Sequence, residues 1–163
     1  MLDVRFVAAL IALTLKGAPF PDPDKALPLL LGTAAQESGL LYLRQLSGGP
    51  GRGLFQCEPQ TERDHWAWLH TQPGVRAVFE SRAAVHGSDA LHLEYNVLYQ
   101  ILLCRLHYYV RDPDPLPDVG DLQGQAALWK RAYNTPHGLG TVAEYVQTYL
   151  HIVLPHLSGS HTV

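Results

Sequence analysis

The sequence predicts a mainly α domain of the α+β kind, in which a bundle of helices surrounds one long central helix. One small β-hairpin is expected beside this bundle. Three observations lead to this prediction. Apolar residues recur at helical spacing over most of the chain, the longest such run covers residues 91–111, and the glycine-rich SGGPGRG at 47–53 cannot be helical. A length of 163 residues favours one domain over residues 1–163.

The first half of the chain predicts two helices followed by a hairpin. Residues 3–16 are apolar enough for a mostly buried helix, which Gly17 and the prolines after it end. A second helix is expected after Pro23, with LLLGTAAQES running to a C-cap at Gly39. The short YLRQL and the glycine-rich segment after it favour a strand–turn–strand excursion over residues 41–57.

The middle of the chain contains the expected core helix. Thr61 with Asp64 indicates a helix start leading into HWAWLH, and Pro73-Gly74 is expected to end that helix. Residues 75–90 have no clear assignment. The run LHLEYNVLYQILLCRLHYYVR at 91–111 is apolar on more than one helical face, which predicts a central buried helix.

Two further helices are expected near the end of the chain. A proline-stiffened loop at 112–121 precedes LQGQAALWKRAYN at 122–134, which favours a helix. Thr141 and Glu144 then form a capping-box pattern at the start of VAEYVQTYLHIVL. The apolar face of this last helix is expected to contain Val142, Tyr145, Val146, Tyr149 and Val153.

The composition excludes several classes of partner. Twelve basic and fifteen acidic side chains give a formal net charge of -3 without a basic run, so nucleic acid is not an expected partner. The uncharged run FVAALIALTL at 6–15 is too short to cross a bilayer, and no cleavage site for a signal peptide follows it. We therefore expect no stable membrane insertion, and synthesis in the cytoplasm without an export signal.

The cysteines and histidines do not form a recognisable site. Cys57 and Cys104 are too few for a disulfide scaffold and are expected to be buried free thiols. The nine histidines lack the spacing of metal ligands, so no metal is expected, and no motif calls for a cofactor. A thiol peptidase built from Cys57 and His65 is a disfavoured alternative.

Glu37 is the most informative candidate for catalysis. It is the one acid between residues 31 and 56, and it falls in the last turn of a predicted helix. The negative end of the helix dipole and burial among leucines both favour the neutral form of the carboxyl group, so its pKa is expected to be raised. A neutral carboxyl group can protonate the leaving oxygen of a glycosidic bond. The alternative is a helix-end glutamate turned to solvent.

Four short motifs in order set Glu37 in a wider pattern. Glu37-Ser38 is followed by GRGLFQ at 51–56, AYN at 132–134 and EYV at 144–146. Together they resemble the lysozyme-like superfamily, most of all its soluble lytic transglycosylase and goose-type lysozyme branch. Phe55 stands where that branch usually has methionine, a change that keeps an apolar side chain. CRLHYYVRDPDPLP at 104–117 is similar to phage-encoded members, and the resemblance covers roughly residues 25–155.

The resemblance implies a lysozyme-like fold with the hairpin at the active-site cleft, and Glu37 as general acid and later base. The substrate-binding residues that it implies are Ser38, Arg52, Phe55, Gln56, Tyr133 and Asn134. Tyr133 would reach toward Glu37 or the N-acetyl group of the substrate, and Asn134 would hold its loop. Other readings remain open, because Ser38 suits a helix cap, Tyr133 a core position, and Arg52 and Arg44 a solvated loop.

The expected substrate is the peptidoglycan glycan strand, cut at the β-1,4 bond between N-acetylmuramic acid and N-acetylglucosamine. A lone carboxylate favours a lytic transglycosylase, which forms 1,6-anhydro ends without a water nucleophile. One alternative is a hydrolytic muramidase with Glu58 or Asp64 as its second acid. Another is a non-catalytic virion structural or glycan-binding protein. Other virion proteins are candidate partners, and the expected place of action is the periplasm and cell wall, at host lysis or when a phage opens the wall.

Overall fold

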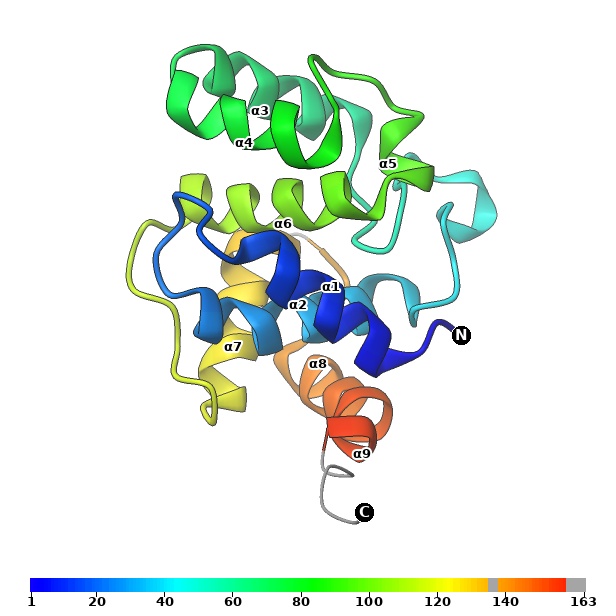
Figure 1. Ribbon diagram of the computed structural model, residues 1–163. Coiled ribbons are helices and arrows are strands. Elements are labelled where there is room, and N and C mark those ends of the chain that lie inside the picture. The colour runs from blue at the N-terminus through cyan, green and yellow to red at the C-terminus, as the bar shows by residue number, and fades with distance from the viewer. Residues whose placement is uncertain (135–137, 158–163) are drawn as a thin grey trace.

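The computed structural model describes residues 1–134 and 138–157 and is mainly helical, as predicted (Figure 1). Its centre is α6 (Val97–Arg111), in which every side chain from Tyr99 to Leu106 is buried. A helix that is buried on all faces must be covered from several sides. The central helix expected from the sequence is therefore present.

Two pairs of helices cover α6 from opposite sides. On one side lie α1 (Val4–Leu15) and α2 (Pro23–Ser38), which pack against each other and against α6. On the other side lie α3 (Pro59–His70) and α4 (Pro73–Ala83), as Figure 1 shows. Buried apolar side chains from both pairs join one connected core with α6 between them.

The predicted helix over 91–111 is in fact two helices. The short α5 (His92–Tyr95) is separated from α6 by Asn96, whose backbone is extended. The Asn96 side chain explains the break, because its oxygen accepts from the backbone N–H of Tyr99 and caps α6. Its amide also donates to the carbonyl of Ala83 at the end of α4, 2.8 Å away.

Two prolines begin helices in this part of the chain. The prediction that a helix starts at Thr61 is wrong by two residues, since α3 starts at Pro59. Pro73 starts α4 directly after α3, and α4 fills much of the segment that had no clear assignment. Proline suits the first helical position, where its missing N–H would have no partner in the helix.

The expected strand–turn–strand excursion contains no regular strands. Residues 41–57 form a loop with two isolated antiparallel bridges, Arg44 with Arg52 and Arg52 with Cys57, and a short 3₁₀ turn, η1 (Leu46–Gly48). The chain leaves α2 through Gly39, which has left-handed backbone (φ 59°) and ends the helix as predicted.

The last two helical segments both contain π-helical turns. In the first, α7 (Leu122–Leu128) continues into the π-helix η2 (Trp129–Asn134). In the second, α8 (Val142–Thr148) continues into the π-helix η3 (Tyr149–Val153) and then α9 (Leu154–Leu157). The second segment packs against α2.

The predicted start of the last helical segment is confirmed. The Thr141 hydroxyl accepts from the backbone N–H of Glu144, whose carboxylate accepts from the backbone N–H of Thr141. Four residues of the predicted apolar face are buried and one is partly buried: Tyr145, Val146, Tyr149 and Val153, and Val142. Among the helices described here, none is both long and apolar enough to cross a membrane.

Candidate active site

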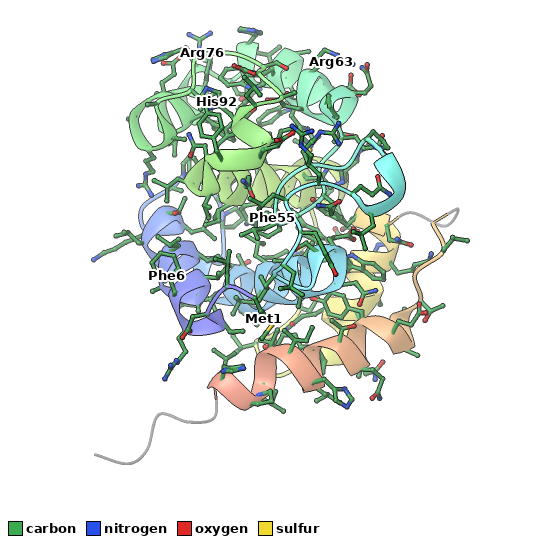
Figure 2. All side chains as sticks on the ribbon, turned by 90° about the vertical axis from the view of Figure 1, so that its right-hand side faces the viewer. Met1, Phe6, Phe55, Arg63, Arg76 and His92 are labelled. Carbon is green, nitrogen blue, oxygen red and sulfur yellow. The ribbon has the colours of Figure 1, made fainter. Side chains whose placement is uncertain are left out.

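A pocket of about 370 Å³ opens between the end of α2, the loop at 45–58, α6 and η2. Four of the predicted site residues line it: Glu37, Gln56, Tyr133 and Asn134. They come from three parts of the chain that are far apart in sequence. Figure 2 labels Phe55, which precedes Gln56 in the loop, near the centre of the view.

Glu37 lies in the last turn of α2 and is mostly buried. Its Oε1 atom accepts a hydrogen bond from the indole N–H of Trp129, 2.8 Å away. Burial raises the pKa of Glu37 to about 7, and the Trp129 N–H opposes this shift. The predicted direction of the pKa shift is thus confirmed, and the carboxyl group is half neutral near pH 7.

The loop that carries Gln56 is fixed to α6 and η2 by hydrogen bonds between its backbone and side chains of those helices. The backbone N–H of Leu54 donates to Oε1 of Gln100, 2.8 Å away. The carbonyl of Phe55 accepts from the Tyr133 hydroxyl at 2.7 Å. Gln56 has left-handed backbone (φ 48°), and its side-chain amide donates to the carbonyl of Gly53.

Tyr133 and Asn134 occupy the end of η2. The Tyr133 ring packs edge-on against His107, with the ring centroids 4.8 Å apart. Its hydroxyl donates to the Phe55 carbonyl, so in this structure it bonds the loop rather than Glu37. Asn134 accepts from Nζ of Lys130, which also donates to the carbonyl of Gly138. Through Lys130, Asn134 is linked to the chain beyond residues 135–137, which lie outside the described residues.

Three other predicted site residues do not line the pocket. The Ser38 hydroxyl donates to the carbonyl of Ala34 and accepts from the N–H of Leu40, which is the helix-cap role left open above. Phe55 is buried in the core and presents only its backbone carbonyl to Tyr133. Arg52 pairs with Glu94, 3.2 Å away, and also donates to two carbonyls of its own loop.

Two residues that the sequence analysis did not single out contact this site. Trp129 bonds to Glu37, and it stands four positions before Tyr133. His107 lines the pocket, accepts at Nδ1 from Nε2 of His65 (2.9 Å), and donates from Nε2 to the carbonyl of Ala132 (3.0 Å). Burial lowers the pKa of His65 to about 3 and that of His107 to about 4, so both rings are neutral near pH 7.

The acids near the pocket differ in their surroundings. Glu58 lines the pocket and is exposed, whereas Asp64 is exposed but does not line it. Glu62, which the sequence analysis passed over, is buried and accepts hydrogen bonds from Tyr99, Ser88 and Asp89. Of the two acids named from the sequence as a possible second carboxylate, only Glu58 therefore shares the pocket with Glu37.

The two thiols are free, with Cys104 buried and Cys57 partly buried. Burial raises the pKa of both, so neither is a thiolate near pH 7. His65 bonds to His107 and not to Cys57, so the Cys57–His65 pair of the thiol-peptidase alternative is not formed. Across residues 1–134 and 138–157, no three His, Cys, Asp or Glu side chains are grouped as metal ligands would be.

The pocket combines a carboxyl group that is neutral below about pH 7 with the polar side chains of Gln56, Glu58 and Asn134. Such a site can give a proton to a bound polar molecule and hydrogen-bond it at the same time. No protein-family model, no curated protein and no solved structure matches this chain.

Proposed function

We propose that the protein cleaves the β-1,4 bond between N-acetylmuramic acid and N-acetylglucosamine in peptidoglycan, as a lytic transglycosylase with Glu37 as its single catalytic carboxyl group. One observation carries the proposal: a carboxyl group with a pKa of about 7 lines the same pocket as Gln56, Tyr133 and Asn134. These four residues come from the motifs that resemble the lysozyme-like superfamily.

In the proposed reaction, the neutral carboxyl group of Glu37 gives its proton to the glycosidic oxygen while the bond from C1 to that oxygen breaks. The electron pair stays on the oxygen, and the N-acetyl carbonyl of the substrate stabilises the positive charge at C1. The carboxylate of Glu37 then takes the proton of the substrate's 6-hydroxyl group while the oxygen of that hydroxyl group bonds to C1. This step closes a 1,6-anhydro ring and returns Glu37 to its neutral form.

The proposal includes a lysozyme-like fold, in which the loop at 41–57 is the counterpart of the hairpin of that superfamily. It also includes action on the bacterial cell wall, in phage-induced lysis or when a phage opens the wall. The position of the loop supports its comparison with that hairpin, since Gln45, Gln56 and Glu58 line the pocket and the Phe55 carbonyl is bonded to η2.

The test is digestion of purified sacculi, with the released muropeptides identified by mass spectrometry. Glu37→Gln keeps the size of the side chain and its bond to Trp129 but removes the acidic proton, so we expect turnover to fall at least about 100-fold. Glu80→Gln is the matched control, because Glu80 pairs with Arg76 on α4 and does not line the pocket. Full activity in Glu37→Gln would refute the assignment.

The second candidate is a hydrolytic muramidase on the same scaffold, and the position of Glu58 favours it. This exposed carboxylate shares the pocket with Glu37 and accepts no cap hydrogen bond from α3, so it is available to activate water. The products separate the candidates, since anhydro ends mean transglycosylase and reducing ends mean hydrolase. An absence of products from the unmodified protein would favour the non-catalytic virion or glycan-binding alternative.

A further inference from the structure

Trp129 makes a polar contact with Glu37 without lining the pocket itself. Its side chain is 1% exposed, and its indole N–H reaches Oε1 of Glu37 at 2.8 Å. The other oxygen, Oε2, has no hydrogen-bond partner in the part of the chain that the structure describes. The two oxygens of one carboxyl group therefore differ in their surroundings.

The indole is held in place by a contact that returns to the helix of Glu37. The ring of Trp129 lies against the ring of Tyr145 in α8, with centroids 5.3 Å apart and planes inclined by 32°. The Tyr145 hydroxyl in turn donates to the carbonyl of Leu29 in α2. Trp129 and Glu37 are thus fixed relative to each other through α2 and α8, as well as by their direct bond.

We propose that Trp129 is a positioning residue, whose N–H holds Oε1 of Glu37 so that the proton of the neutral acid resides on Oε2. An oxygen that accepts an N–H is favoured as the carbonyl-type oxygen of a carboxylic acid, which leaves the hydroxyl on the other oxygen. After the proton has left, the same N–H stabilises the carboxylate. This inference rests on the proposed function only for its catalytic meaning, since the contact itself can be tested without substrate.

Other groups that titrate also face Glu37 and must be separated from the effect of Trp129. They come from α6, η2 and the loop before α3, and they are Cys104, Tyr108, His107, Arg111, Tyr133, Cys57 and Glu58. The indole of Trp129 does not titrate, so replacing it changes no charge in the site. Any change in the titration of Glu37 then reflects the lost N–H or a movement of the ring.

The experiment replaces Trp129 with benzothienylalanine, which has nearly the shape of tryptophan and carries sulfur in place of the N–H. The matched control has the same replacement at Trp66, whose indole N–H donates to Tyr99 at 2.7 Å without contacting Glu37. Carbon-13 NMR of the side-chain carboxyl group follows the titration of Glu37, and sacculus digestion gives the pH profile of kcat/KM.

Loss of the N–H at position 129 removes a bond that favours the carboxylate, so we expect the pKa of Glu37 to rise by about one pH unit. The alkaline limb of the activity profile should move by the same amount. An unchanged titration at position 129, or an equal shift with the control, would overturn the inference. If the analogue protein does not fold, Trp129→Phe provides the same titration test. An inactive unmodified protein would refute the proposed function, whereas the NMR result would still decide the role of Trp129.

Discussion

Glu37 has a carboxyl group that changes charge near neutral pH while it lies mostly buried at the end of α2. Its pKa is raised above that of the unfolded chain, so the folded state holds this proton more tightly than the unfolded state does. The corresponding contribution to stability is complete below about pH 4.5 and is lost as the pH rises through about 7. The property that suits an acid catalyst therefore makes the protein less stable in alkali.

Glu37→Gln should remove this loss of stability, because glutamine has no charge to bury. We expect the free energy of unfolding of the variant, relative to the unmodified protein, to be about 2 kcal/mol higher at pH 8.5 than at pH 4.5. Urea unfolding at both pH values measures it. Glu80→Gln is the control, because it removes a carboxylate that pairs with Arg76 on α4 and does not line the pocket. An equal effect of Glu37→Gln at both pH values would contradict the prediction.

At the residue scale, the motifs located part of the pocket, since Ser38, Arg52 and Phe55 of the same motifs do not line it. The four motif residues that do line one pocket are Glu37, Gln56, Tyr133 and Asn134. Trp129 could not be predicted in the same way, since its bond to Glu37 joins residues 92 positions apart. The local spacing gave one usable signal, because Trp129 precedes Tyr133 by four positions and such residues share a helical face.

Within the element α2, Gly32 permits the closest approach of a second helix. A Cβ atom built at Gly32 would lie 2.0 Å from the hydroxyl oxygen of Tyr145 and 3.0 Å from the ring of Tyr149. Both tyrosines belong to the last helical segment, whose contact with α2 depends on that space. Glycine here is a packing requirement and not a flexible point in the helix.

Gly32→Ala should therefore destabilise the protein, although alanine is favoured over glycine in a helix by about 1 kcal/mol. The clash with Tyr145 should outweigh this preference and lower the free energy of unfolding by about 2 kcal/mol. Gly74→Ala is the control, because no atom lies within 4 Å of a Cβ at that exposed position of α4. Thermal and urea unfolding measure both variants, and an unchanged Gly32→Ala protein would be evidence against this packing.

Helix ends were predictable where the signal is local. Gly39 ends α2, and Thr141 with Glu144 starts α8, because each side chain or backbone angle acts on its own neighbours. Asn96 misled the prediction, since apolar spacing continues across it while its side chain caps α6 and bonds to Ala83. The loop at 41–57 misled it too, because its backbone forms isolated bridges in place of regular strands and also bonds to side chains of α6 and η2.

At the scale of the whole molecule, the two histidines connect the layers around α6. His65 in α3 donates to His107 in α6, which donates to the carbonyl of Ala132 in η2. With both rings neutral, each nitrogen in this chain of bonds has one defined role. A second proton on His107, at Nδ1, would place an N–H group against the N–H group that His65 donates.

Acid should therefore weaken the assembly of layers. The folded pKa values of about 3 for His65 and about 4 for His107 lie below the ordinary value of 6.5, so the unfolded chain binds protons first. The contribution of the two rings to stability should be constant above about pH 6.5 and fall toward pH 4, by up to about 1.4 kcal/mol per pH unit for each ring. In urea unfolding, His107→Gln should lower the slope of the free energy of unfolding against pH by the share of one ring, up to about 1.4 kcal/mol per pH unit.

The His107 substitution is measured in a protein that also carries Glu37→Gln, because Glu37 affects stability in the opposite direction between about pH 4.5 and 7. His86→Gln, at an exposed position between α4 and α5, is the control and should leave the slope unchanged. A slope that is the same with and without His107 would show that the histidine pair does not carry the acid sensitivity.

The π-helical winding of η2 sets the angle between Trp129, which bonds to Glu37, and Tyr133, which bonds to the loop. Deleting one residue between Trp129 and Tyr133 would place Tyr133 three positions after Trp129 and change the angle between their side chains. The number of residues in η2 therefore determines the shape of the pocket as its side chains do. A related protein with one residue fewer in this stretch would have a pocket of a different shape.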